Sequence, residues 1–431
     1  MKPKIKKHEK GQIIIILVLA FVGLLGFVAV AVDGGMIYSD RRYDQNAADA
    51  SALAGAGVAA QKMENDGVNY VNFSCTSTDV QNAMDVAVMK TKERALANNF
   101  ILDETLDSQH GVVVNCVDDE WNGAYDEKYL DVTVMISSEV KTGFAHLFYK
   151  GPIRNTVEAV VRIRPRTSLT FGYAIAAIRK ECDGLEFDGS NDVTIFNGGV
   201  YSAGCFLTNG GVNVIADADF GNNYTSDLII NGSGYVSPYP QKLTEQLPSF
   251  SVPTPNCAAL PWRGNITKPE KNTPIAPGRY GSITIGNNDF LSMQKGLYCI
   301  NDGIKMTGGD IEGIGVTIYL TGGDIELTGG TVDLEAPTST DVPYAILGML
   351  IYVAPGYAGS VDMAGNGDSF YMGTVYAPDG SVEVGGTSGI NPTFSTQVIA
   401  DRVKVHGNSK IDINFDIAQI YQNPAYLDMY K

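Results

Sequence analysis

Two pairs of acidic residues are the best candidates for chemistry in this chain. Asp310 and Glu312 lie in one copy of a repeated Thr-Gly-Gly-Asp-Ile-Glu motif, and Asp324 and Glu326 lie in the next copy. Residues two apart on a strand share a face, so each pair could bind calcium or act as general acid and base. The competing interpretation, which we favour, is a solvated acidic face on adjacent structural repeats.

Other reactive groups are scarce or scattered. Between residues 301 and 400 the only Lys or Arg is Lys305, which argues against a cleft for acidic sugars. The four histidines (8, 110, 146 and 406) have no Ser or Cys nucleophile context. No Gly-rich phosphate-binding loop follows a strand. The sequence therefore predicts no catalytic, metal-binding or cofactor-binding residue, no cofactor, and a chain that is not an enzyme.

The N-terminus combines a basic leader with a membrane-length apolar run. Residues 1–11 contain five lysines, and residues 12–32 contain no charge. Twenty-one helical residues reach about 31 Å, the thickness of one hydrocarbon core. The positive-inside rule places residues 1–11 in the cytoplasm and everything after Asp33 outside it. A cleaved signal peptide ending near Ala31 is the alternative, and a prepilin signal is weaker because Ile16 stands where Glu is needed.

The net charge limits the partners. The 431-residue chain carries −17 overall although its first ten residues carry about +4, so the exported part is strongly acidic. An acidic surface repels phosphates, and no basic stripe with interleaved aromatics occurs, so we expect no nucleic-acid partner.

Two helices and a small domain are predicted after the span. Residues 33–62 are rich in Ala and lack Pro, which predicts a helix continuing from the membrane. Its small side chains favour either close helix packing or simply high helix propensity. Residues 63–166 predict a small α/β domain with a helix over 77–100, strands at 112–117, 130–136 and 157–163, and an amphipathic segment at 143–149.

Residues 167–431 change character and predict a right-handed β-solenoid. Apolar-polar-apolar triplets alternate with Gly-rich turns, and their first residues recur 21 apart. A fixed period with three-residue strands is typical of stacked coils whose apolar residues point inward. The fold class is therefore α+β and mainly β. The first residues of the two regular series are Ile283, Ile304 and Ile325, and Val361, Val382 and Val403.

Residues 237–277 interrupt the solenoid with nine prolines. We interpret this stretch as an excursion or linker between two blocks of coils, anchored by Cys257.

The six cysteines all follow the span and are even in number, which indicates disulfides in an exported region, although buried thiols are the alternative. Fifteen pairings are possible. We favour Cys75 with Cys116 inside the α/β domain, Cys182 with Cys205 between neighbouring coils, and Cys257 with Cys299.

Residues 11–56 resemble the N-terminus of TadE/TadG-like Flp (tight-adherence) pilus-assembly proteins. Gly-Gln opens the span, Asp-Gly follows it, and an Arg precedes the motif Gln-x-Ala-Ala-Asp-Ala-x-Ala-Leu-Ala-x-Ala. Asp44 stands where the family usually has an apolar residue. The matching residues are Gly11, Gln12, Asp33, Gly34, Arg42, Gln45, Ala47, Ala48, Asp49, Ala50, Leu53, Ala54 and Ala56.

The resemblance implies a single-pass protein of the bacterial inner membrane whose partners are other Tad/Flp assembly proteins or pilin. It implies an accessory or minor pilin-like component that supports pilus assembly, anchoring or surface adhesion. Many relatives carry a metal site with the pattern Asp-x-Ser-x-Ser, but residues 188–192 read Asp-Gly-Ser-Asn-Asp, so we carry over no metal site. The alternatives are a surface adhesin or glycan-binding solenoid outside any pilus and, less favoured, a carbohydrate-active solenoid enzyme.

Overall fold

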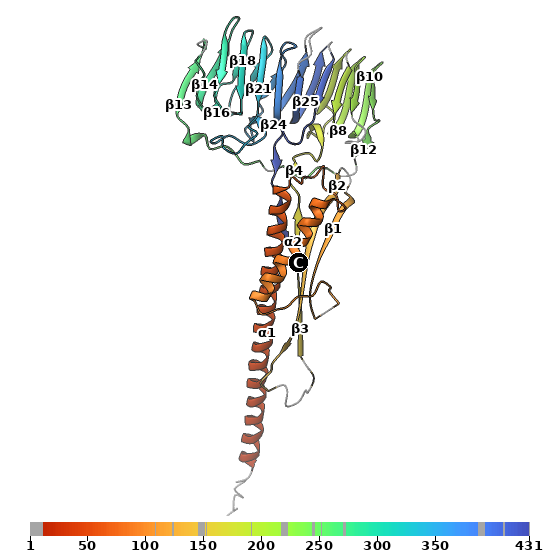
Figure 1. Ribbon diagram of the computed structural model, residues 1–431, viewed down its shortest axis with the longest axis vertical. Helices are drawn as coiled ribbons and strands as arrows, with labels where there is room; N and C mark the ends of the chain where they lie inside the picture. The colour runs from red at the N-terminus through yellow and green to blue at the C-terminus, as the bar shows by residue number, and fades with distance from the viewer. Residues whose placement is uncertain are drawn as a thin grey trace, which may run out of the picture.

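The computed structural model shows an elongated molecule with three parts: a long N-terminal helix, a stalk built around its second half, and a solenoid lying across the far end of the stalk (Figure 1). The structure describes residues 12–107, 109–122, 125–144, 151, 153–190, 192–216, 223–243, 246–250, 252–269, 273–386, 393–407 and 410–430. The predicted leader at 1–11 and most of the amphipathic segment at 143–149 lie outside these residues.

Helix α1 (Gln12–Asn65) joins the predicted span and the predicted Ala-rich helix into one element of 54 residues. No Pro interrupts this stretch, and Ala has the highest helix propensity of all residues. At about 1.5 Å per residue the helix is about 80 Å long. The predicted continuation of the span into the Ala-rich helix is confirmed.

The stalk adds helix α2 and an antiparallel sheet to the second half of α1. Helix α2 (Thr78–Ala97) starts at Ser77, whose hydroxyl accepts a hydrogen bond from the backbone N–H of Val80. The sheet has the order β1-β2-β3-β28, and alternate residues of β2 are buried in the core that it shares with both helices. The stalk strands are β1 (His110–Asn122), β2 (Tyr125–Val140), β3 (Ile153–Arg164) and β28 (Tyr426–Met429).

Strand β28 corrects the predicted domain organisation. We placed all of residues 167–431 in the solenoid domain, but Tyr426–Met429 pairs antiparallel with β3 of the stalk. Without β28, β3 would be an open edge with unpaired backbone groups, which proteins usually cover. The C-terminus of the chain thus returns to the stalk and ties the solenoid to it.

The predicted β-solenoid is confirmed and has about ten turns. Its turns are short parallel strands with apolar residues inside and polar residues outside. The strands are β5 (Tyr173–Ala177), β6 (Leu185–Gly189), β7 (Asp192–Phe196), β8 (Gly199–Gly210), β9 (Asn213–Ala216), β10 (Tyr224–Gly232), β11 (Tyr235–Ser237), β12 (Gln241–Lys242), β13 (Trp262–Ile266), β14 (Gly278–Ile285), β15 (Phe290–Met293), β16 (Gly296–Ile300), β17 (Ile304–Met306), β18 (Asp310–Ile314), β19 (Val316–Leu320), β20 (Ile325–Leu327), β21 (Thr331–Glu335), β22 (Met349–Val353), β23 (Ser360–Met363), β24 (Phe370–Gly386), β25 (Thr393–Gly407) and β26 (Ile411–Asn414).

The 21-residue period corresponds to the register between neighbouring coils. The first residue of each regular triplet pairs with the first residue of the next, and all six are almost fully buried. Residues 336–348 lengthen one coil, which explains the gap between the two regular series. The column reads Ile283, Ile304, Ile325, Val361, Val382 and Val403.

Glycines make the corners between strands. Gly309 and Gly330 both have a φ near +70°, a conformation that residues with a side chain rarely adopt. A Cβ added to Gly330 would lie 1.7 Å from the carbonyl oxygen of Gly309 one coil away. The repeated Gly-Gly pairs therefore serve both the turn and the close stacking of turns.

The order of coils in space differs from their order in the chain. The last coil strands, β25 and β26, stack on β5, β6 and β7, which come first in the sequence. The column of Val403 thus continues into Leu185 and then Phe206. The chain enters and leaves the solenoid near its middle, where β4 (Thr167–Ser168) pairs antiparallel with β27 (Gln422–Asn423).

The Pro-rich segment must consequently connect the two ends of the stack, from β12 to β13. It is not wholly an excursion, because β12 and β13 within residues 237–277 belong to the solenoid sheet. Between them, the backbone N–H of Leu247 donates to the Tyr201 hydroxyl (3.2 Å), and the Tyr352 hydroxyl donates to the Val252 carbonyl (3.2 Å). This crossing segment, residues 246–250 and 252–260, covers one outer face of the coils.

Tyrosines fill that covered face in successive coils. They pair in register as Tyr319, Tyr352 and Tyr376, and as Tyr201 and Tyr224. All five are at most 6% exposed, and burial raises the pKa of Tyr376 to about 12. These outward side chains form a second core between the coils and the crossing segment.

Candidate functional site

The apolar half of α1 is exposed along its length. Residues 13–28 and 30–32 lie on the surface, and Phe27 and Val30 are 78% and 74% exposed. A side chain of that kind gains about 1.5–3 kcal/mol when it leaves water. Within the described parts of the chain, α1 is the one helix long and apolar enough to cross a membrane. Its apolar half lies at the opposite end of the molecule from the solenoid (Figure 1).

Asp33, the first charge after the apolar run, is 6% exposed. Its carboxylate accepts hydrogen bonds from the backbone N–H groups of Gly143 (2.6 Å) and Phe144 (3.0 and 3.1 Å to the two oxygens). These two residues follow β2, so Asp33 fixes the end of the β2–β3 hairpin against α1.

The Ala-rich half of α1 is the central core element of the stalk. Ala48, Ala52 and Ala56 are fully buried in a core shared with α2 and the sheet. A Cβ on Gly55 would lie 2.0 Å from the Thr91 hydroxyl oxygen of α2. Of the two interpretations of the small residues, the structure supports close helix packing, and the partner is α2 of the same chain.

Polar residues of the same helix face the sheet. Gln45 donates from Nε2 to the Asp49 carboxylate (2.7 Å) and to the Glu158 carbonyl of β3 (3.2 Å). Asp44 is 2% exposed and accepts a hydrogen bond from the Ser138 hydroxyl. Burial raises the pKa of Asp44, although the Ser138 hydrogen bond opposes that shift. Ser138 of β2 thus supplies a hydroxyl opposite the Asp44 carboxylate.

Comparison with known protein families decides what this helix is. Residues 11–60 match the family described as Flp pilus-assembly TadE/G-like (Tad). This segment is a TadE/G-like domain. No curated protein and no solved structure matches the chain.

The TadE/G-like domain confirms the resemblance inferred from the sequence and associates the chain with Tad pilus assembly. Together with the exposed apolar helix it fits a single-pass membrane protein. The match ends at residue 60, just before α1 ends at Asn65. Of the residues of its motif, Asp33, Ala47, Ala48 and Ala56 are buried. Gly34, Arg42 and Leu53 are exposed, and Arg42 lies 5.8 Å over the Tyr38 ring.

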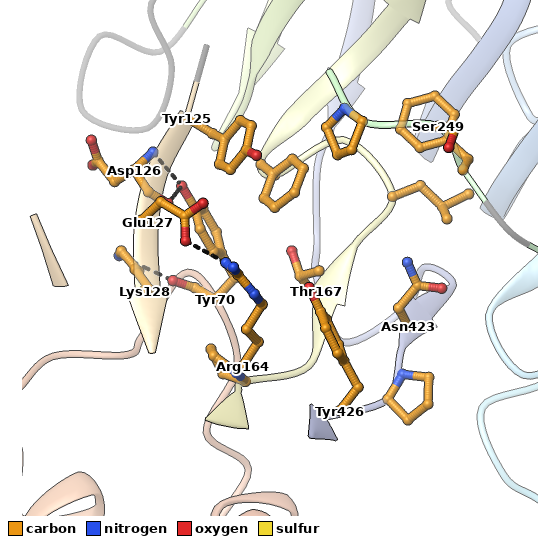
Figure 2. A pocket seen from close by; sticks show the side chains of 16 residues that line it. Tyr70, Tyr125, Asp126, Glu127, Lys128, Arg164, Thr167, Ser249, Asn423 and Tyr426 are labelled. Atoms are coloured by element: carbon orange, nitrogen blue, oxygen red, sulfur yellow. Dashed lines mark hydrogen bonds and ion pairs between the residues drawn. The ribbon is translucent and has the colours of Figure 1, made fainter. Parts of the chain in front are cut away.

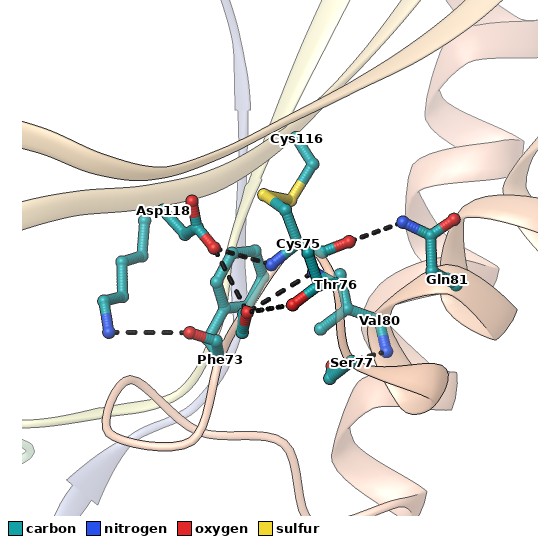
Figure 3. The surroundings of a disulfide bond; sticks show 10 residues. Phe73, Cys75, Thr76, Ser77, Val80, Gln81, Cys116 and Asp118 are labelled. Atoms are coloured by element: carbon teal, nitrogen blue, oxygen red, sulfur yellow. Dashed lines mark hydrogen bonds between the residues drawn. A yellow bond between two sulfur atoms is a disulfide. The ribbon is translucent and has the colours of Figure 1, made fainter.

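All three favoured disulfides are present: Cys75–Cys116, Cys182–Cys205 and Cys257–Cys299. The first ties the loop before α2 to β1 (Figure 3). Asp118 on β1 reinforces this link because its carboxylate accepts the backbone N–H of Cys75 (2.7 Å). The third disulfide holds the crossing segment to β16.

A cavity of about 430 Å³ lies at the joint between stalk and solenoid. Five separate stretches of chain line it (Figure 2). The rings of Tyr125 and Phe171 stack with centroids 4.1 Å apart across the joint. Arg164 pairs with Glu127, and Lys128 donates to the Tyr70 carbonyl (3.0 Å), so these charged side chains already have partners in the cavity wall. We interpret the cavity as a feature of the packing between stalk and solenoid and not as a ligand site.

The two acidic pairs lie differently on the surface of the coils. Asp310 and Glu312 do share the outer face of β18 and are exposed. Asp324 precedes β20 and accepts the backbone N–H of Ser360 (2.8 Å), whereas Glu326 pairs with Lys305 (2.6 Å). Among the residues that the structure describes, no group of three or more His, Cys, Asp or Glu side chains could hold a metal ion.

The string at 188–192 also serves the solenoid surface. Asp188 lies 3.6 Å from Lys404 on the next coil, and Asp192 accepts a hydrogen bond from Asn213 (2.8 Å). Asn191, His8 and His146 lie outside the described residues. The sequence missed the Asp33 contact, the covered tyrosines and strand β28, all of which depend on residues far apart in the chain.

Proposed function

We propose that this chain is a structural, minor pilin-like component of a Tad pilus assembly system. It would be anchored in the bacterial inner membrane by α1, with residues 1–11 in the cytoplasm and the stalk and solenoid outside. The TadE/G-like match over residues 11–60 carries the proposal. The lysines before the span and the three disulfides after it support the orientation.

The geometry suits a spacer that presents a solenoid at a distance from the membrane. From Asp33 to Asn65 the rigid helix covers about 48 Å, and the stalk packs along this stretch. The solenoid lies across the end of this stalk (Figure 1). We propose that it presents a broad surface to pilin, to other Tad proteins or to a surface target, and that the chain acts without catalysis.

A deletion strain tests the role. Loss of the chain should lower the number of Flp pili per cell, counted by electron microscopy, and the wild-type chain should restore it. The double variant Asp310→Asn, Glu312→Gln should restore pili equally well, because a structural role needs neither carboxylate. Normal pilus numbers in the deletion strain would refute the assembly role, and a failure of the double variant would show that this acidic face of the solenoid is required.

A further inference from the structure

Strand β3 runs beside α1 toward the membrane span. Gln45 contacts the Glu158 carbonyl, and Asn155 Nδ2 donates to the Ile37 carbonyl (3.4 Å). Between these contacts the helix rises about 12 Å over eight residues, and the strand advances about 10 Å over three residues. The two elements therefore stay level with each other as they approach the membrane.

The end of the hairpin reaches the membrane boundary. Two residues beyond Asn155 the strand reaches Ile153, about 7 Å further on, and four residues beyond Ile37 the helix reaches Asp33, about 6 Å further on. Ile153 begins β3, and its pairing with Val140 is the β2–β3 pair nearest the membrane. The end of β2, where Val140 pairs with Ile153, thus lies level with the first charge after the apolar run.

The hydrogen bonds of Asp33 independently place residues 143 and 144 at this level. Hydrogen bonds from backbone N–H groups to a carboxylate are charge-assisted and stronger than hydrogen bonds between neutral groups. A Cβ on Gly143 would lie 3.3 Å from Asp33 Oδ1, so Gly permits the close approach. Three contacts of 2.6 to 3.1 Å therefore fix the backbone of Gly143 and Phe144 beside the end of the span.

The side chains at this level suit the boundary between water and lipid. Phe144 is 40% exposed, and Lys141 beside it is exposed. On α1, Tyr38 is 63% exposed with Arg42 over its ring. Aromatic rings concentrate at membrane interfaces, and Lys and Arg there are attracted to anionic headgroups.

We propose that residues 141–144, which follow β2 and which we call the tip, are a second membrane contact, in which the Phe144 ring enters the headgroup region of the bilayer and Lys141 faces lipid phosphates. Asp33 is the positioning residue that holds this tip against α1. A single helix is free to tilt and rotate in a bilayer, whereas a second contact beside it fixes the direction of the stalk. The inference needs only that residues 13–32 span a membrane, and it is independent of the role in pilus assembly.

Tryptophan fluorescence tests the lipid contact. The full chain with Trp121→Phe, Trp262→Phe and Phe144→Trp has one Trp at the tip and is reconstituted in phosphatidylcholine–phosphatidylglycerol vesicles with or without brominated acyl chains. The matched control is Trp121→Phe alone, which keeps Trp262, 54% exposed on the solenoid. We expect at least twofold quenching at position 144 and none at Trp262. Equal emission with and without bromine at position 144 would overturn the proposal.

The same measurement tests the positioning role. Adding Asp33→Ala removes the acceptor of the tip and should reduce the quenching at position 144 by half or more. The span itself is unchanged, so the variant should still resist carbonate extraction. Full quenching in the Asp33→Ala variant would show that Asp33 does not hold the tip at the membrane.

Discussion

Two glycines in α1 allow a test of how the TadE/G-like helix packs. Gly55 faces α2, and a Cβ added there would lie 2.0 Å from the Thr91 hydroxyl oxygen and 2.7 Å from the Ala87 carbonyl oxygen. Gly57, two residues later on the same helix, has no atom within 4 Å of such a Cβ. Gly55→Ala and Gly57→Ala are therefore the same chemical change in a filled and in an open position.

The two variants should change the stability of the stalk in opposite directions. Ala is more favourable than Gly in a helix by about 1 kcal/mol, so Gly57→Ala should stabilise the stalk by up to that amount. Gly55→Ala gains the same propensity, but overpacking against a backbone carbonyl costs about 1–3 kcal/mol. Since the propensity gain is common to both variants, Gly55→Ala should be less stable than Gly57→Ala by about 1–3 kcal/mol.

Hydrogen exchange measured by mass spectrometry on the detergent-solubilised full chain gives the local stability of the stalk. Protection of peptides from α2 should fall in Gly55→Ala relative to Gly57→Ala by about five- to 150-fold, as 1.4 kcal/mol corresponds to a factor of ten. Equal protection in both variants would refute the α1–α2 contact and leave helix propensity as the reason for the small residues.

Three further predictions concern the solenoid and the cysteines. Val382→Asp should strongly lower the melting temperature of the solenoid, because it replaces a fully buried side chain in the stacked column by a carboxylate. The neighbouring residue faces outward, so Glu383→Ala should alter stability by only about 0.5 kcal/mol or less. Equal damage by both variants would contradict the inward–outward assignment. Burial raises the pKa of Asp362, and the charge of Glu383 raises it further. The ionised form therefore destabilises the fold, and the stability measured by urea unfolding should rise as the pH falls through that raised pKa toward 3.8. Asp362→Asn should stabilise the chain at neutral pH and flatten this rise, and an unchanged profile would contradict the burial of Asp362. Alkylation of the exported, non-reduced chain should add no label, since all six cysteines are paired, and six labels would contradict the disulfides.

Local patterns were sufficient to predict the long helix and the inward column of the solenoid, but not strand β28. The uncharged run at 12–32, the absence of Pro and the Ala-rich stretch predicted one long helix, because these properties act within a few turns. The 21-residue spacing from Ile283 to Ile325 predicted the inward column, because coils adjacent in sequence stack on each other. The spacing of about one coil favoured the pairing of Cys182 with Cys205, whereas Cys257 and Cys299 were the pair that remained.

Long-range packing was not predictable in the same way. The pairing of Val403 with Leu185 joins coils more than 200 residues apart, and the triplets contain no feature that selects this neighbour over another coil. The path of the crossing segment follows from this order of the coils in space. The tyrosines beneath it recur at coil spacing, a signal that was present but also compatible with an exposed aromatic face.

In the candidate site, too, the residues could be identified from local patterns but their long-range contacts could not. The motif identified Asp33 as a residue of the TadE/G-like pattern, but its contact with Gly143 spans 110 residues of sequence. Asp44, an unusual acid in that pattern, is explained by Ser138 on the sheet. The residues were visible in the sequence, and their partners required the fold.

The most direct test of a structural role in Tad pilus assembly is to identify what the chain contacts in its own membrane. Intact cells would be treated with a cleavable cross-linker, the full-length chain purified from the membranes through a C-terminal tag, and its partners quantified by mass spectrometry against an unrelated single-pass protein carrying the same tag. We predict enrichment of pilin or other Tad assembly proteins with this chain. Detection of those proteins in the same membranes without any enrichment over the control would contradict the account.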